Sequence, residues 1–180
     1  MTSSELQQKL YEFIQPSYPE IDIKIEETGG RRLLYFTENK FKDLYPQQRY
    51  HYLIHCIPDY FFQQHLNNST WFELAPGEAP EDLEYPDVEL IEEIKEDVLA
   101  ALNKSGFVST LDNEFISGEV QCHGDFRHAK RILTGIGFAE EPQFYAFHVM
   151  MNEGGYCDCE ILYNVFRETA YAKNYWRNRK

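Results

Sequence analysis

The sequence contains no apolar run long enough to span a lipid bilayer. Its first residues, Met1 to Glu5, also lack the basic and apolar segments of a secretory signal peptide. We therefore expect a cytoplasmic protein without a membrane partner. In that reducing compartment, closely spaced cysteines are more often metal ligands or redox pairs than structural disulfides.

Positive charge is also scarce. The chain has 17 Lys and Arg residues against 30 Asp and Glu residues, which gives a net charge of −13. A field of this sign repels nucleic-acid phosphates and anionic lipids at long range, so we expect no nucleic-acid partner. The same charge is compatible with an acidic immunity or stress-response protein that is recognised through its surface. A hydrophobic content of 43% over 180 residues provides core for one compact domain or two small ones.

Several catalytic signatures are missing. The sequence has no glycine-rich phosphate loop, no Gly-x-Ser-x-Gly elbow and no Cys-x-x-Cys motif of the thioredoxin type. The sequence therefore favours a non-catalytic protein over an enzyme.

The first half of the chain has the patterns of a small α/β unit. Ser3 or Ser4 can cap a first helix, and Gly29-Gly30 supplies a tight hairpin turn. Pro46 suits the first turn of a second helix, which Pro58 should end or kink. The expected elements are a helix over 3–14, strands over 21–26 and 33–37, a helix over 47–57 continued over 59–66, and a strand over 71–74.

This order resembles the BolA family, whose fold is a small K-homology-like unit. The residues that carry the resemblance are Asp22-Ile23-Lys24-Ile25-Glu26-Glu27 with the following hairpin, Phe41, Arg49-Tyr50-His51, and Trp71-Phe72-Glu73-Leu74-Ala75-Pro76. The resemblance covers roughly residues 4–76. It implies a link to iron–sulfur or thiol metabolism and a glutaredoxin as partner. BolA proteins share a cluster with a monothiol glutaredoxin through a histidine that falls at Thr70 here, with His65 nearby. This departure argues against cluster binding.

The second half is expected to be mainly helical. An acidic linker precedes a helix that begins near Pro86 and buries Leu90, Ile91, Ile94, Val98 and Leu102. We expect a short hairpin or irregular segment over 107–121 and helices over 126–134 and 142–151. A last helix from Cys157–Cys159 should carry residues up to Ala170 inward, and a basic tail over 173–180 should fray.

The predicted fold class is thus α+β. A BolA/K-homology-like αββαβ unit is followed by a mainly helical C-terminal subdomain. The expected divisions are residues 1–76 for the α/β domain, 77–104 for the acidic linker and helix, and 105–180 for the helical domain with its Cys/His cluster.

The stretch Glu153-Gly154-Gly155-Tyr156-Cys157-Asp158-Cys159-Glu160 has the most specific chemistry in the chain. The glycines let the backbone turn sharply, so Cys157 and Cys159 can converge just before a helix, where the helix N-terminus favours thiolate. Cys122 sits before another expected helix and can approach from the opposite side. His128 or the adjacent His123 could supply a fourth ligand. Four such donors suit tetrahedral zinc.

This half also resembles an uncharacterised bacterial domain family with a terminal Gly-Gly-Tyr-Cys-Asp-Cys-Glu motif. An upstream Cys and a following Arg of that family match Cys122 and Arg127, over roughly residues 118–167. The family places a His two positions after that Cys, where this chain has Gly124. The resemblance implies no activity, because the family is a domain of unknown function.

Three interpretations remain open from the sequence. The first is a zinc-type metal-binding adaptor or regulatory protein with a protein partner. The second is an enzyme or redox protein, in which Cys157 and Cys159 cycle between dithiol and disulfide or a metal with an open position activates water. The third is the acidic immunity or stress-response protein. Buried, inert thiols are the alternative to any site, and Cys56 is expected to be one of these.

Overall fold

The chain folds into two compact units, Met1–Tyr85 and Pro86–Lys180, of mixed α+β class and mostly helical content. The computed structural model describes residues 1–179, so Lys180, the last residue of the expected tail, lies outside the described residues. The expected intermediate segment 77–104 is divided between the two units at residue 85. Within residues 1–179, none of the helices combines the length and the apolar character needed to cross a membrane.

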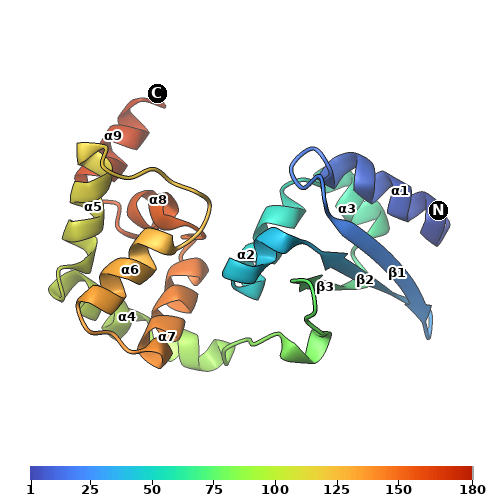
Figure 1. The fold of residues 1–180 in the computed structure, drawn as a ribbon, viewed down its shortest axis with the longest axis horizontal. Helices are drawn as coiled ribbons and strands as arrows, with labels where there is room; N and C mark the ends of the chain where they lie inside the picture. The colour runs from blue at the N-terminus through green and yellow to red at the C-terminus, as the bar shows by residue number, and fades with distance from the viewer. Residues whose placement is uncertain (180) are drawn as a thin grey trace. The chain divides into compact units, whose positions relative to one another are not determined.

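The N-terminal unit, Met1–Tyr85, contains α-helices, short 3-10 helices (η) and a small sheet (Figure 1). Its elements are α1 (Ser3–Ile14), β1 (Asp22–Thr28), β2 (Arg31–Thr37), η1 (Asn39–Asp43), α2 (Pro46–Ile54), α3 (Asp59–His65), β3 (Ser69–Leu74) and η2 (Pro80–Asp82). The cap of α1 is Thr2 rather than Ser3 or Ser4, because Thr2 and Glu5 form a reciprocal capping box.

The sheet has the order β1-β2-β3. Strands β1 and β2 are antiparallel and joined at Gly29 and Gly30, whose φ values of 59° and 78° suit a tight hairpin turn. Strand β3 is parallel to β2, which requires the helical crossover supplied by α2 and α3. Ile23, Leu34 and Phe36 point from the sheet into the core, where they join buried apolar residues of α1, α2 and α3.

Arg49, one of the residues that carry the BolA resemblance, has a structural role here. Its side chain is only 4% exposed. It donates hydrogen bonds to the carbonyls of Leu44 (2.9 Å) and Glu73 (2.8 Å), and it binds the carboxylate of Glu78 through both terminal nitrogens. A bidentate pair of this kind fixes geometry as well as charge. Arg49 therefore ties the segment after β3 back onto α2.

The C-terminal unit, Pro86–Lys180, consists of helices and connecting loops, with no strand among its described residues. Its elements are α4 (Val88–Lys104), α5 (Phe107–Ser117), α6 (Arg127–Gly135), α7 (Glu140–Asn152), α8 (Asp158–Glu160), a π-helical turn η3 (Ile161–Val165) and α9 (Ala170–Arg177). Helix α4 is capped by Asp87, so Pro86 precedes the helix instead of opening it.

The expectation of a hairpin or irregular segment over 107–121 is wrong, because α5 occupies most of it. Phe107, Val108, Leu111 and Phe115 are buried at helical spacing. Phe107, Phe115, Ile116 and Val120 have a loose period of two, which predicts a hairpin, but Val108 and Leu111 do not fit that period. Gly106 and Gly118 adopt left-handed conformations at the two ends and stop the helix there.

Two further expectations about this unit need correction. Leu90 was expected inside but is 36% exposed, whereas Ile91 and Leu102 are buried. The predicted last helix is interrupted at Phe166, whose φ and ψ of −105° and 65° are not helical. The chain resumes as α9, so much of the expected frayed tail is ordered. Asp112 accepts hydrogen bonds from the first backbone amides of α9. The ring of Tyr175, in α9, stacks on the ring of Tyr163 with a centroid distance of 4.1 Å.

Candidate metal centre

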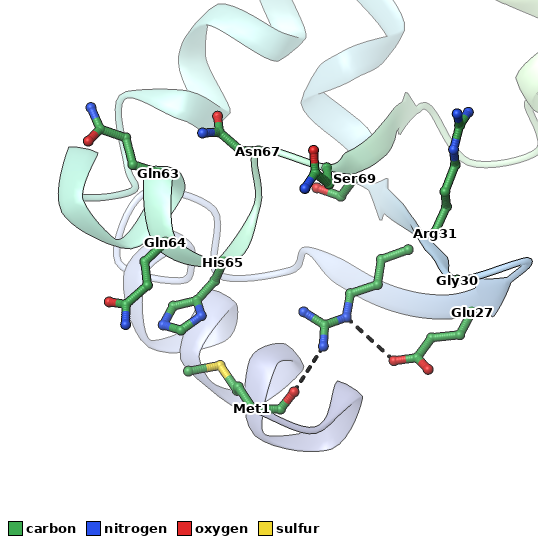
Figure 2. A pocket seen from close by; sticks show the side chains of 11 residues that line it. Met1, Glu27, Gly30, Arg31, Gln63, Gln64, His65, Asn67 and Ser69 are labelled. Carbon is green, nitrogen blue, oxygen red and sulfur yellow. Dashed lines mark hydrogen bonds and ion pairs between the residues drawn. The ribbon is translucent and has the colours of Figure 1, made fainter.

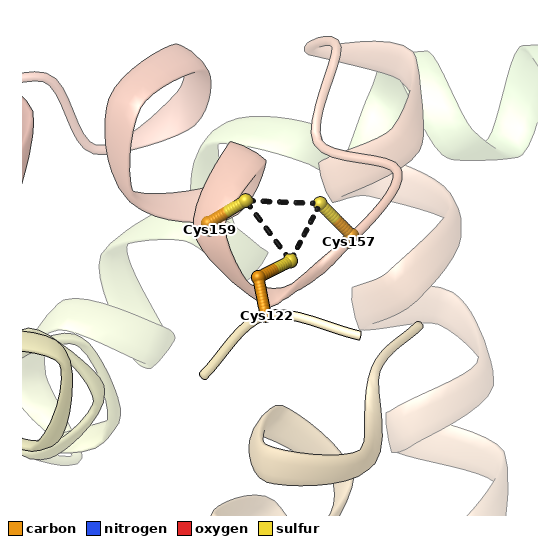
Figure 3. Close-up of side chains that lie close together, drawn as sticks. All are labelled: Cys122, Cys157 and Cys159. Atoms are coloured by element: carbon orange, nitrogen blue, oxygen red, sulfur yellow. Dashed lines mark hydrogen bonds between the residues drawn. The ribbon is translucent and has the colours of Figure 1, made fainter. Parts of the chain in front are cut away.

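Three cysteine sulfurs of the C-terminal unit, from the segment before α6 and from the start of α8, meet in a small triangle (Figure 3). The Sγ–Sγ distances are 3.4 Å for Cys122 and Cys157, 3.3 Å for Cys157 and Cys159, and 3.0 Å for Cys122 and Cys159. Cys157 is 5% exposed, and Cys122 is the most exposed of the three. The structure thus brings together side chains that lie 35 and 37 positions apart along the chain.

The triangle is small enough for one metal ion to reach all three sulfurs. Its corners lie roughly 1.9 Å from its centre, which is less than a Zn–S bond of ~2.3 Å. A point just above the plane is therefore one bond length from all three sulfurs. In a [4Fe–4S] cluster, by contrast, each thiolate binds a different iron, which spreads the cysteine sulfurs farther apart. The three cysteines could hold a single metal ion.

The turn that carries Cys157 and Cys159 depends on its two glycines. Gly154 has a φ of +86°, and its carbonyl accepts a hydrogen bond from the Asn164 side chain at 2.8 Å. A Cβ at Gly155 would lie 2.9 Å from Val165 Cγ2 and 3.2 Å from both Ile161 Cα and the Met150 carbonyl oxygen. The close packing of α7 against η3 is therefore possible only without a side chain at Gly155.

Asp158, between the two cysteines, has a role that the sequence reasoning missed. Its side chain is fully buried and accepts hydrogen bonds from the backbone amides of His128 (3.1 Å) and Ala129 (2.9 Å) at the start of α6. Its own amide donates to the carbonyl of Asp125 at 3.0 Å. Asp158 thus caps a helix that begins 31 positions earlier in the sequence. Burial raises the pKa of this carboxyl to about 6, although the two amides oppose the shift.

The segment that carries Cys122 is held by His128 and Asp125. The Nε2 atom of His128 lies 3.2 Å from the carbonyl oxygen of Gln121, the residue before Cys122. The carboxylate of Asp125 forms an ion pair with the Arg127 side chain and accepts a hydrogen bond from the Arg127 backbone amide. His128 is therefore linked to both cysteine loops, through its ring to Gln121 and through its backbone to Asp158.

The histidines predicted as fourth ligands are not part of the sulfur triangle. Among residues 1–179, the ligand atoms that lie mutually within 4.8 Å at this place are the three sulfurs alone. The rings of His123 and His128 lie near each other, with centroids 6.1 Å apart. Which of them completes the site stays a prediction.

The other acidic and thiol candidates have separate partners. Glu160 accepts a hydrogen bond from the Tyr156 amide at 2.9 Å, which closes the cysteine turn. Glu153 forms an ion pair with Lys95 of α4 at 3.1 Å. Cys56 belongs to the N-terminal unit, where it packs against the core and donates to the Tyr52 carbonyl.

The three thiols share their protons unequally. Hydrogen bonds with Cys157 and Cys159 hold the pKa of Cys122 well below its usual range. The contacts with Cys122 raise the pKa values of Cys157 and Cys159, and burial adds to both shifts. Cys122 is therefore the first of the three thiols to lose its proton as pH rises. The thiolate is the form that binds metals and attacks disulfides.

A polar hollow of about 430 Å³ lies in the N-terminal unit, beside the β1–β2 hairpin (Figure 2). Arg31, Arg32, His65 and Ser69 are among the residues that line it. Arg32 already donates to the Met1 carbonyl (2.9 Å) and to Glu27 (3.4 Å). His65 is the last residue of α3, whereas Thr70 lies in β3.

Comparison with protein families gives a match over part of the chain. Residues 107–164 match a family described as Protein of unknown function (DUF2695), and this stretch includes all three cysteines of the triangle. The expected resemblance to an uncharacterised domain family is confirmed for these residues, whereas no BolA-like domain or motif is found. No curated protein matches the chain, and no solved structure matches it. The part of this chain from α5 through η3, which contains the three-cysteine cluster, is thus similar to a domain of unknown function.

Proposed function

We propose that this chain is a non-catalytic metal-binding adaptor or regulatory protein in which Cys122, Cys157 and Cys159 hold one zinc-type ion. The sulfur triangle is the observation that carries the proposal, because all three sulfurs can reach one point at a metal–sulfur bond length. Thiolate ligands select soft or borderline ions such as zinc over magnesium and calcium. The ion would join the loop before α6 to the turn after α7.

A histidine completes the tetrahedral site in this proposal, and His128 is better supported than His123. The contact of His128 Nε2 with the Gln121 carbonyl leaves Nδ1 as the nitrogen for an ion. Ligating histidines typically donate their other ring nitrogen to such a carbonyl. Because the His128 backbone is also bonded to Asp158, a small movement of the ring changes its distance to the sulfurs without moving α6.

The role as an adaptor rests on the two-unit organisation. The element order and the parallel β2–β3 pairing of the N-terminal unit support the proposal of a BolA-like, K-homology-like fold. A protein partner, with a glutaredoxin as one candidate, and a link to iron–sulfur or thiol metabolism follow only from that resemblance. Fold alone does not determine function.

A dithiol redox protein is the second candidate, and the short sulfur contacts favour it. Cys159 lies 3.3 Å from Cys157 and 3.0 Å from Cys122, and Cys122 has a lowered pKa. A low-pKa thiol next to a second thiol is the arrangement that redox cysteines use.

Elemental analysis of protein purified without added metal, combined with thiol counting, separates the two candidates. The adaptor proposal expects one zinc per chain and three thiols that react only after chelation. Cys122→Ser should lose the zinc, whereas Cys56→Ser, in the other unit, should keep it. His128→Asn should lower zinc affinity more than His123→Asn. Metal-free protein with a rapidly reacting, low-pKa thiol would instead support the redox candidate.

A further inference from the structure

The shape of the sulfur triangle carries information beyond the presence of an ion. With metal–sulfur bonds of ~2.3 Å, its edges of 3.0 to 3.4 Å correspond to S–metal–S angles of roughly 80–95°. A tetrahedral ion at the same bond length needs sulfurs ~3.8 Å apart. Zinc would therefore have to widen every edge of the triangle. An ion with three pyramidal bonds near right angles would not.

The frame around the triangle resists such widening. The interval between Cys157 and Cys159 is set by Asp158, which is fully buried and bonded to two amides of α6. The turn before Cys157 is packed at Gly155 against η3 with no space for a single methyl group. Two of the three sulfurs are therefore attached to backbone that is fixed by buried contacts.

Three donors are also what the described residues supply. Within residues 1–179, no histidine nitrogen or carboxylate oxygen joins the three sulfurs within 4.8 Å. Trivalent arsenic requires no fourth donor, because its lone pair occupies that side of the pyramid. Its bonds to sulfur are about as long as the Zn–S bond, ~2.3 Å.

The charge of the complex also favours trivalent arsenic over zinc. Three thiolates around Zn²⁺ leave a net charge of −1, whereas three thiolates around As³⁺ are neutral. The site lies in a chain of net charge −13, with the buried Asp158 and the half-buried Glu160 in the same turn. A neutral complex avoids the cost of placing further negative charge among partly buried acidic groups.

From this geometry we propose that the Cys122–Cys157–Cys159 triangle is a binding site for trivalent arsenic, supplied as arsenite. The inference rests on the proposed metal-binding function and names the class of ion that suits the site best. In the reaction, As(OH)₃ and three cysteine thiols give As(S-Cys)₃ and three waters. Three As–O bonds break and three As–S bonds form, each thiol proton leaves with a hydroxide as water, and no atom changes oxidation state. Cys122, the most exposed of the three thiols, is the point of first attack.

The test uses the full chain, freshly reduced with a phosphine, and sodium arsenite as the probe. Native mass spectrometry should show one bound arsenic with the loss of three hydrogens. Thiol counting should fall from four reactive cysteines to one, because Cys56 lies outside the triangle. Both measurements use the wild-type protein, so they do not depend on the folding of a variant. Two protected thiols instead of three would overturn the proposal.

Variants provide the matched comparison. Cys122→Ser, Cys157→Ser and Cys159→Ser should each weaken arsenite binding on the order of 100-fold, because the third bond forms within an already bound complex. Cys56→Ser should leave it unchanged. Arsenite binding of undiminished affinity in Cys122→Ser would also overturn the proposal.

A parallel zinc titration separates this inference from the function on which it rests. Stoichiometric zinc without arsenite would remove the inference and leave the zinc adaptor. Arsenite without zinc would support the inference and remove zinc as the resident ion. Binding of neither ion would remove both.

Discussion

Single buried residues set how this protein responds to pH, and Glu73 is the clearest case. It lies in β3 with a side chain that is 2% exposed, and its Oε1 atom has no hydrogen-bond partner within the described residues. Burial raises the pKa of Glu73 from 4.5 to about 7, although Arg49 nearby opposes the shift. The folded N-terminal unit therefore holds a proton at Glu73 that the unfolded chain releases above about pH 4.5.

The sign of the resulting pH dependence follows from linkage. Between about pH 4.5 and 7 the folded state binds more protons than the unfolded state, so stability falls as pH rises through this window. Glu73→Gln removes the ionisable group. We expect the substitution to raise the free energy of unfolding by roughly 2–3 kcal/mol at pH 8 and to have little effect at pH 4.

Denaturant unfolding at the two pH values, followed by the fluorescence of Trp71 in a Trp176→Phe background, measures this difference. Trp71 packs on Phe36 in the same unit and therefore reports on it. Glu81→Gln, at an exposed position, is the control for the loss of one negative charge. Equal effects of both substitutions at pH 8 would contradict the assignment to Glu73.

At the same scale, the sequence identified the cysteines but not the residues that position them. The spacing of Cys157 and Cys159 behind a glycine pair predicted a convergent turn, and Cys122 was correctly placed with them. The role of Asp158 could not be predicted, because its partners are the amides of α6, which are distant in sequence. The residues next to Asp158 in the sequence do not indicate that its carboxylate caps a helix about 30 positions away.

At the scale of elements, the turn between α7 and α8 is constrained by close packing at Gly155. A methyl group at Gly155 would contact the backbone of η3 and the carbonyl of Met150, and backbone cannot move aside as a flexible side chain can. We expect Gly155→Ala to lower the free energy of unfolding by about 1–3 kcal/mol and to weaken metal binding, because the turn aims Cys157.

Gly135→Ala is the matched control for this prediction. Gly135 ends α6 with ordinary φ and with open space around its Cβ position. Alanine there should be neutral or stabilising by up to ~1 kcal/mol. Thermal unfolding of both variants, together with zinc titration, checks the pair. The constraint at Gly155 would be refuted if the two alanines behaved alike.

The element predictions succeeded where periodicity was strong and failed where it was read at the wrong period. The strands and helices of the N-terminal unit follow their apolar spacing closely. The segment of α5 was misassigned because Phe107 and Phe115 fit a period of two until Val108 and Leu111 are included. The break at Phe166 has no proline or glycine to mark it, so the sequence predicted one helix where α8, η3 and α9 follow one another.

At the scale of the whole molecule, the two units should lose stability separately. The three cysteines belong to Pro86–Lys180, so removal of the ion should affect this unit alone. Each unit also contains one of the two tryptophans, Trp71 and Trp176. An ion present at about a thousand times its dissociation constant stabilises its unit by ~4 kcal/mol.

Chelation in single-tryptophan variants measures this separation. In Trp71→Phe, which reports on the C-terminal unit, a chelator should lower the unfolding midpoint. In Trp176→Phe the midpoint should not move. A shift of the same size in both variants would show that the two units unfold as one.

Asp158 has a consequence for any attempt to transplant this centre. Because the residue between the cysteines is committed to capping α6, the Cys-x-Cys interval is dictated by a helix and not by the coordination chemistry. Widening it to Cys-x-x-Cys would pull the Asp158 carboxylate away from the amides of His128 and Ala129 or turn one sulfur aside. A graft of the motif onto another scaffold would need to include the receiving helix as well.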